Sequence, residues 1–234
     1  MKMENKENYY KNIVVNKPWG YEYLAYENEH VGLWFLHIEK DQETSLHCHP
    51  KKDIGLIVLE GSVDVCFLSS TNWLGTGKKI MIRKGLFHST KALAENGANI
   101  FEIETPKLKH DLVRLEDKYG RKATPYEGKS SEQEKNKECI SFKDPKLNEK
   151  DSYIFSNCRI TLESITSKEA FLSKEDDCNI TFLKGGILAN DEKTCIASPG
   201  DIIISHIVKR LLKTFEKIHK ETIIMIIKPL KELN

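Results

Sequence analysis

The chain has 234 residues, of which 39% are hydrophobic and 30% are charged, as in an ordinary soluble globular protein. Lys and Arg number 36 against 35 Asp and Glu, so the net charge of +1 gives no electrostatic reason to expect a nucleic-acid or membrane partner. The N-terminus is polar and no apolar run approaches the roughly 18 to 20 residues of a bilayer span, which predicts a cytoplasmic protein.

Short segments rich in Val, Ile and Phe, separated by Gly, Asn, Asp or charged residues, predict an all-β fold. In the first half the expected strands are 31–39, 55–59, 62–68, 79–83, 99–104 and 111–114. A second strand-rich block has expected strands at 153–165, 178–183, 194–197, 201–204 and 222–227, and a segment at 207–219 that is either a short helix or a strand and a turn. Strands this closely spaced favour sandwiches or barrels.

The stretch between these two blocks is polar and has almost no periodic apolar positions, which is typical of a linker. We therefore expect a first domain over 1–121, a polar linker over 122–151 and a second β domain over 152–234.

Three histidines carry the clearest chemical signal. His47 and His49 are two positions apart, and side chains at i and i+2 of a strand point to the same face. His88 follows a glycine turn at Gly85, at the end of another expected strand. Neutral imidazoles suit Zn, Fe, Ni, Cu or Co, so we predict one divalent metal ion, with Mn as a further candidate, at these three residues. A lone strand histidine, or even a pair, is more often structural, and the third histidine is what favours a metal.

The sequence around these histidines resembles a known family. The His-x-His pair with a glycine twelve residues after His49, at Gly61, and the Gly-x-x-His at 85–88 resemble the two cupin motifs. Residues 17–23 (KPWGYEY) and 111–121 (DLVRLEDKYGR) resemble the flanks of the type II mannose-6-phosphate isomerase domain, so the resemblance covers 17–121. It implies a jelly-roll barrel that holds a metal inside.

One position departs from the family pattern. The glutamate ligand that the resemblance implies falls at residue 54, which is Ile54 and cannot bind metal. Asp53 is the nearest candidate, although strand alternation points it to the opposite face unless a bulge re-aims it. Glu102, Glu104 or His37 on neighbouring strands are weaker alternatives.

Basic and aromatic residues near the motif are candidates for substrate binding. Such cations either bind a phosphate or nucleotide-sugar diphosphate or form a solvated rim. The aromatic residues either line a sugar pocket or belong to the core. The candidates are Lys52, Arg83 and Lys84, with Lys51 and Lys91 beside them, and Trp19 and Tyr21, with Trp34 and Phe87 more typical of core.

The second half resembles a jelly roll that has lost its site. Residues 198–205 (SPGDIIIS) resemble the turn before the second cupin motif, but Arg210 stands at the ligand position, and His206 and His219 do not have ligand spacing. We expect two tandem jelly-roll barrels, the second degenerate; the alternative is an irregular cap on a homodimer.

The sequence is compatible with three functions. The resemblance implies a metal-dependent isomerase-like enzyme of carbohydrate metabolism, acting on a phosphorylated or nucleotide-linked sugar in surface-polysaccharide biosynthesis, and a homodimer. The absence of a carboxylate at Ile54 favours instead a non-catalytic sugar-binding or regulatory cupin. A three-histidine site also resembles the iron site of cupin dioxygenases. The isomerase reaction needs a base that moves a proton between adjacent carbons, and the sequence assigns no residue to that role.

Overall fold

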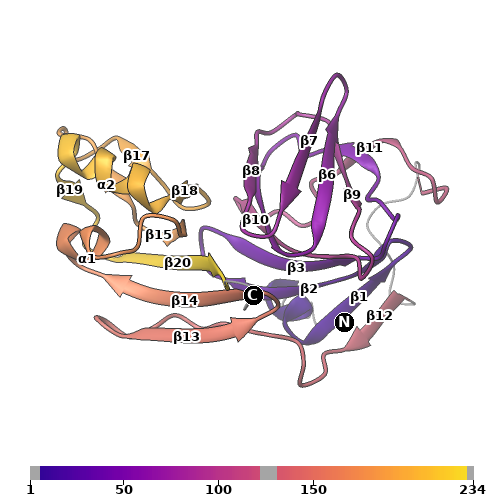
Figure 1. The fold of residues 1–234 in the computed structure, drawn as a ribbon, viewed down its shortest axis with the longest axis horizontal. Coiled ribbons are helices and arrows are strands. Elements are labelled where there is room, and N and C mark those ends of the chain that lie inside the picture. Colours follow the sequence, from indigo (N-terminus) through magenta and orange to yellow (C-terminus); the bar gives the residue numbers. More distant parts are fainter. Residues whose placement is uncertain (1–5, 122–130, 231–234) are drawn as a thin grey trace.

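The computed structural model describes residues 6–121 and 131–230, and most of its elements are antiparallel strands (Figure 1). A short 3-10 helix, Lys6–Asn12, precedes the first strand. The strands of the first half are β1 Ile13–Lys17, β2 Gly20–Glu27, β3 Gly32–Ile38, β4 Leu46–Cys48, β5 Asp53–Glu60, β6 Ser62–Phe67, β7 Thr71–Gly75, β8 Lys79–Ile82, β9 His88–Ala92, β10 Ala98–Thr105 and β11 Val113–Glu116. The expected strands in this half are confirmed, with β11 shifted two residues along the chain. Strand β4 agrees with the strand alternation assumed at His47 and His49, while β1, β2, β7 and β9 were not anticipated.

Two sheets form the first barrel. One has the strand order β12-β1-β2-β3-β10-β5-β8, in which β12 is Glu132–Glu134, and the other has β11-β4-β9-β6-β7. Figure 1 shows the second sheet standing over the first. Side-chain alternation fills the space between them: Trp34, Leu36 and Ile38 of β3 belong to the barrel interior, whereas Leu33 and Phe35 face the opposite side of the sheet. The first half is therefore a jelly roll with its own core, as the sequence predicts.

The second half is a smaller, incomplete barrel. One sheet has the order β13-β14-β20-β15-β18, a second has β17-β16-β19, and two helices complete the core. Its elements are β13 Lys150–Phe155, β14 Cys158–Ile165, α1 Lys168–Leu172, β15 Asn179–Lys184, β16 Ile187–Leu188, β17 Cys195–Ala197, β18 Ile202–Ile204, α2 Ser205–Thr214, β19 Lys217–Ile218 and β20 Thr222–Pro229. None of the helices in the described ranges is long and apolar enough to cross a bilayer.

One expectation for this half needs correction, and one open alternative is decided. The predicted single strand over 153–165 is wrong, because it is a hairpin of β13 and β14 that turns at Ser156 with a positive φ of 51°. A non-glycine residue seldom adopts that conformation, so the sequence carries no strong turn signal there. The ambiguous segment at 207–219 is a helix, α2, that ends at Thr214 and is followed by the short strand β19.

The two halves share a hydrophobic core. Leu33, Phe35 and Phe101 on the outer face of the first sheet belong to the same buried cluster as Ile160 and Met225 of the second half. Figure 1 shows β14 and β20 extending between the second half and this junction, with β20 running toward β2 and β3 and the antiparallel β14 running away from them. The jelly rolls are therefore packed together through one face of each large sheet.

The backbone of the second half also approaches the first sheet closely at this junction. Gly200, with φ of 98°, lies against Thr105 of β10, and a Cβ at this glycine would stand 2.0 Å from the Thr105 hydroxyl oxygen. The Pro-Gly-Asp turn thus has a packing role between the halves, because only glycine fits both the φ value and the space.

Part of the polar segment 122–151 joins the first barrel. Strand β12, Glu132–Glu134, pairs with β1, and Phe142 is buried with its main-chain N–H donating to Ala25 O over 2.8 Å. The positions of the two domain boundaries stay predictions, because the halves share a core and residues 122–130 lie outside the described residues.

Candidate metal centre

Three histidines meet inside the first barrel. His47 on β4 lies directly opposite His88 on β9, and His49 follows the end of β4, so strand pairing brings the three side chains to one face. Their candidate ligand nitrogens all lie within 4.8 Å of one another. All three residues are buried, with 8%, 6% and 2% exposure for His47, His49 and His88. The predicted triad is a real cluster of convergent imidazoles.

Main-chain carbonyls orient each ring. The hydrogen bonds at Nδ1 measure 2.7 Å from His47 to Ser45 O, 2.6 Å from His49 to Asp111 O and 3.0 Å from His88 to Leu86 O. A carbonyl oxygen only accepts, so Nδ1 carries the proton in every ring and Nε2 keeps its lone pair. This is the arrangement in which metal-binding histidines are held by their other nitrogen.

The rings are also held neutral. Burial, reinforced by the Lys52 ammonium, lowers the pKa of His49 to about 3 and that of His88 to about 4, and burial lowers the pKa of His47 well below its ordinary value. Nε2 of His49 is buried and has no hydrogen-bond partner among the described residues. A divalent metal fits this orphaned nitrogen and its two neighbours, because neutral imidazole lone pairs are its preferred donors.

A glycine turn positions the third histidine. Gly85 has φ of 78°, and its N–H donates to His49 O over 2.8 Å. The turn ties the loop before β9 to the end of β4, so that His88 enters its strand opposite His47. Glycine is favoured three residues before His88 because most other residues do not adopt this φ.

The structure brings no carboxylate into this cluster. Ile54 is 1% exposed and packs in the barrel core. Asp53 belongs to the opposite face of β5, where its carboxylate accepts a hydrogen bond of 2.7 Å from the main-chain N–H of Lys84. Strand alternation operates here without the bulge that would have re-aimed Asp53. The ligand set in the described residues consists of the three histidines.

A buried ion pair stands beside the triad. Lys52 and Glu104 are 3% and 2% exposed, and the Lys52 ammonium binds the Glu104 carboxylate, which also accepts a hydrogen bond of 3.1 Å from the Trp34 indole N–H. Glu104 was a candidate substitute ligand, but its oxygens are held by these two partners. His37, another candidate, bonds to Asn99 over 2.7 Å on the other face of the sheet.

A second group of buried charges lines the cavity next to His47 and His49. Glu22, 6% exposed, pairs with Lys109 over 2.5 Å and with Lys17 over 3.4 Å. The Lys109 ammonium also lies 3.3 Å from the centroid of the Trp34 ring. The cavity has a volume of about 60 Å³ and is also lined by Lys52, Glu102, Arg114 and Arg121. Burial of several charged groups costs folding free energy, and such groups cluster at functional sites, so this end of the barrel is a candidate site.

Glu102 is the acidic group of this cavity with raised proton affinity. It lies on β10 between Ile100 and Glu104, on the face that points into the barrel. Burial raises its pKa, and the neighbouring Lys52 and Lys109 oppose that effect only in part. Its carboxylate is not part of the histidine cluster. The arrangement suits a proton-transfer group better than a metal ligand.

The structure separates the predicted substrate-binding residues. Lys52 and Trp19 line the cavity beside the histidines. Arg83 and Lys84 are exposed in the turn after β8 and do not line it. Tyr21 points to the opposite face of its sheet, where it lines a different cavity.

Sequence reasoning did not single out Glu22, Lys109 or Arg114. The strand pattern of β2 does point to Glu22, because this residue lies on the same face as the apolar Leu24. A charged side chain on the core face of a strand needs a buried partner. The partners come from β1, β11 and the segment before β11, and sequence alone does not place these beside β2.

The second half carries no matching centre. Within the described ranges the only group of convergent metal-binding side chains is the triad of the first barrel. Arg210 and the exposed His206 lie on helix α2, and the exposed His219 lies in the loop after β19.

The two facing sheets make the first barrel a jelly roll, and the three histidines lie inside it. No protein-family model and no curated protein sequence matches the chain. Among solved structures, KdgF from Halomonas sp. is 15% identical with a TM-score of 0.37, and the match covers 39% of this chain and 84% of that one.

Two further solved structures each resemble part of the chain. A cupin-2 domain containing protein from Shewanella frigidimarina is 26% identical, with a TM-score of 0.33, over 38% of this chain and 83% of that chain. A putative sugar phosphate isomerase from Acidithiobacillus ferrooxidans is 20% identical, with a TM-score of 0.32, over 36% of this chain and 55% of that chain.

Proposed function

We propose that the protein is a metal-dependent cupin enzyme that acts on a small phosphorylated sugar by proton transfer. The observation that carries the proposal is the group of cations that surrounds a neutral metal-ligand set. Five basic and two acidic side chains line the cavity beside the histidines. Two of the cations, Lys52 and Arg121, are paired with Glu104 and Asp117, which do not line the cavity.

A bound divalent ion would add two positive charges beside these cations, because neutral imidazoles cancel none of its charge. Such a site favours an anion, and phosphate is the anion that lysine and arginine bind best. The Glu22 carboxylate fixes Lys17 and Lys109 in place, and Asp117 fixes Arg121 with a contact of 2.6 Å. The cations are therefore oriented before any ligand arrives, which lowers the entropy cost of binding.

Within this proposal Glu102 moves the proton. His47, His49 and His88 would hold the metal, which would supply Lewis-acid polarisation of the sugar carbonyl oxygen. Glu102 takes the proton from the hydroxyl-bearing carbon adjacent to the carbonyl carbon and returns it to the carbonyl carbon, while the hydroxyl proton passes to the former carbonyl oxygen. The raised pKa of Glu102 brings it nearer to the working pH than an ordinary carboxyl.

A second candidate, a non-catalytic sugar-binding cupin, has two observations in its favour. Ile54 leaves the metal without an anionic ligand from the protein, and the cavity volume of about 60 Å³ is well below the roughly 300 to 1,000 Å³ of ordinary ligand sites. A cavity of this size admits the phosphate or the carbonyl end of a sugar, while the remainder lies outside.

Solvent-proton exchange distinguishes the two candidates. Metal-loaded protein is incubated in D₂O with hexose and pentose phosphates, and deuterium at C1 or C2 is followed by NMR. The proposal expects incorporation with wild type and a loss of at least about 100-fold with Glu102→Gln. Lys109→Met leaves Glu22 paired with Lys17 and should raise KM with little effect on kcat. Binding of sugar phosphates without exchange under any metal would support the second candidate and overturn the first.

A further inference from the structure

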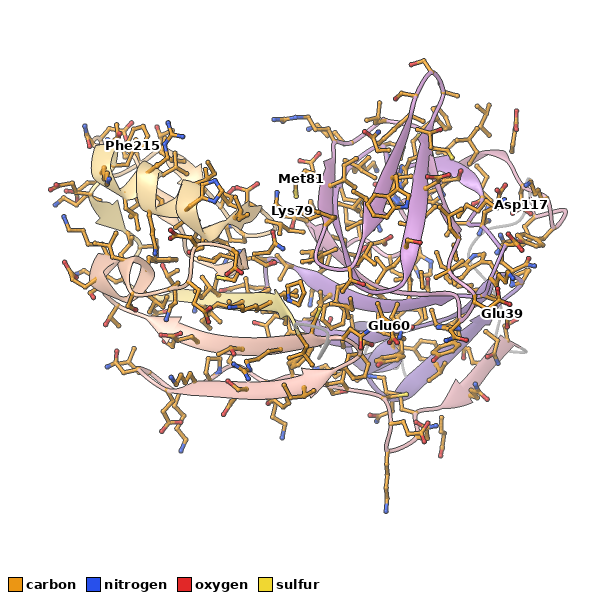
Figure 2. The ribbon with its side chains drawn as sticks, in the orientation of Figure 1. Glu39, Glu60, Lys79, Met81, Asp117 and Phe215 are labelled. Atoms are coloured by element: carbon orange, nitrogen blue, oxygen red, sulfur yellow. The ribbon has the colours of Figure 1, made fainter. Side chains whose placement is uncertain are left out.

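A larger cavity lies on the opposite face of the first sheet. It has a volume of about 510 Å³, which falls in the usual range for small-molecule sites. Its walls come from β1, β2, β3 and β10 of the first barrel, from the stretch 133–139, and from the β13–β14 turn. Glu60, labelled in Figure 2 near the junction of the halves, accepts a hydrogen bond of 3.1 Å from Asn99 of this wall. The metal centre belongs to the barrel interior, on the other side of the sheet.

The floor of this outer cavity is aromatic. Phe35 stacks on Tyr23 with ring centroids 4.9 Å apart, and Phe155 meets Phe35 edge to face at 5.3 Å. Tyr21 is half-buried and stacks on His37 at 5.2 Å, so its ring is held in a fixed orientation. Rings fixed in this way offer apolar surface without a loss of side-chain entropy on binding.

Several polar groups at the rim of the outer cavity have no hydrogen-bond or ion-pair partner among the described residues. The Tyr21 hydroxyl makes no hydrogen bond to another described residue, and the Glu134 and Glu138 carboxylates have no ion-pair partner among them. Asn136 uses its side-chain oxygen to accept from the Glu138 N–H over 3.0 Å, which leaves its amide N–H₂ for a ligand. Carboxylates accept hydrogen bonds and do not donate, so this rim favours a ligand rich in hydroxyl donors.

The wall on the side of the second half is held rigidly. Asn99 donates to Ser156 Oγ over 3.0 Å, and its side-chain oxygen is paired with the His37 ring. Ser156 stands in the tight β13–β14 turn with its positive φ. The cavity therefore exists because the second half packs against the first sheet, and the degenerate barrel supplies part of its wall.

None of the described lining residues is Lys, Arg or His. An anion would meet the Glu134 and Glu138 charges without a cation to bind it, which excludes the ligand class that suits the inner cavity. We propose that the outer cavity binds a neutral, polyhydroxylated ring, such as a glycosyl residue, with its apolar face on Tyr21 and its hydroxyls on Glu134, Glu138 and Asn136. The site is separate from the metal centre and needs no metal.

Saturation-transfer NMR with neutral glycosides tests this assignment. The probes are methyl α-glucoside, methyl α-mannoside, maltose and cellobiose, added to the full chain in the presence of EDTA. At least one should bind with a Kd on the order of 0.1 to 10 mM. Tyr21→Leu and Glu138→Gln should each weaken binding about two- to tenfold, because one removes the ring face and the other a hydrogen-bonding charge.

Matched controls separate the site from general surface effects. Trp73→Leu removes an aromatic ring that is 61% exposed on β7, and Glu95→Gln removes an exposed carboxylate elsewhere; both should leave binding unchanged. Inorganic phosphate should not compete. The proposal is overturned if no glycoside binds, if Tyr21→Leu binds as well as Trp73→Leu, or if tetramethylammonium binds in place of the glycosides. Because EDTA is present, these outcomes are independent of the metal-dependent function.

Discussion

Glu104 lies directly opposite Ile54 on the neighbouring strand, and its carboxylate binds Lys52 instead of joining the histidines. The anionic charge expected at position 54 is thus present one strand away, but it neutralises an ammonium. A neutral ligand set beside a buried ion pair leaves the charge of a bound metal to be met by an exogenous anion. This pairing is the basis for expecting an anionic substrate.

The Lys52–Glu104 pair should show strong coupling. Lys52→Met or Glu104→Gln alone leaves one buried group without its partner and should lower the free energy of unfolding by about 3 to 5 kcal/mol. The double variant should cost much less than the sum of the two. Urea unfolding of all four proteins, without metal, measures the coupling. Additive losses would show that the two side chains do not depend on each other.

Patterns that lie within a few residues of each other predicted much of this structure. Pairing between segments far apart in the chain could not be predicted from the sequence. His47, His49 and Gly85 were found because strand alternation and a left-handed turn leave a mark within a few residues. The pairing of Glu104 with Lys52 depends on the register of β10 against β5, between segments about fifty residues apart. No pattern in one sequence encodes that register, so buried charges on apolar strands were not matched to partners.

Ile54 should behave as core and not as part of the metal shell. Ile54→Val removes one methyl group from a residue that is 1% exposed and should lower the free energy of unfolding by about 0.5 to 1.5 kcal/mol. Metal content should equal that of wild type, because the side chain holds no donor atom. Elemental analysis beside urea unfolding checks both parts, and a drop in bound metal would contradict this assignment.

The stability contributed by Glu102 should depend on pH. Burial raises its pKa above the ordinary 4.5, so the folded state favours the protonated carboxyl, and the chain loses stability as the pH rises from 4.5 through the raised pKa. Glu102→Gln keeps a neutral group of the same shape. Its stability relative to wild type should therefore increase between pH 4 and pH 7 in the metal-free protein. Urea midpoints across this range measure the difference; a constant difference would argue against a raised pKa.

Cysteine reactivity should report the junction between the halves. Cys158 is fully buried, donates its S–H to Leu59 O over 3.4 Å, and has a pKa that burial raises to about 12. Cys195 is exposed on β17. At pH 8 iodoacetamide should label Cys195 within minutes and leave Cys158 unmodified unless the chain unfolds. Mass spectrometry locates the labels, and early modification of Cys158 would show that the halves are not packed through this core.

The most direct test of the metal centre is the metal content of wild type beside the His47→Ala, His49→Ala double variant. Both are purified without chelator, and an exposed histidine, His206, is changed to Ala as the control. Elemental analysis should find close to one divalent ion per chain in wild type and in His206→Ala, and almost none in the double variant, because a single remaining imidazole does not hold the ion. Equal metal content in wild type and the double variant, with both folded by circular dichroism, would contradict the assignment of the site.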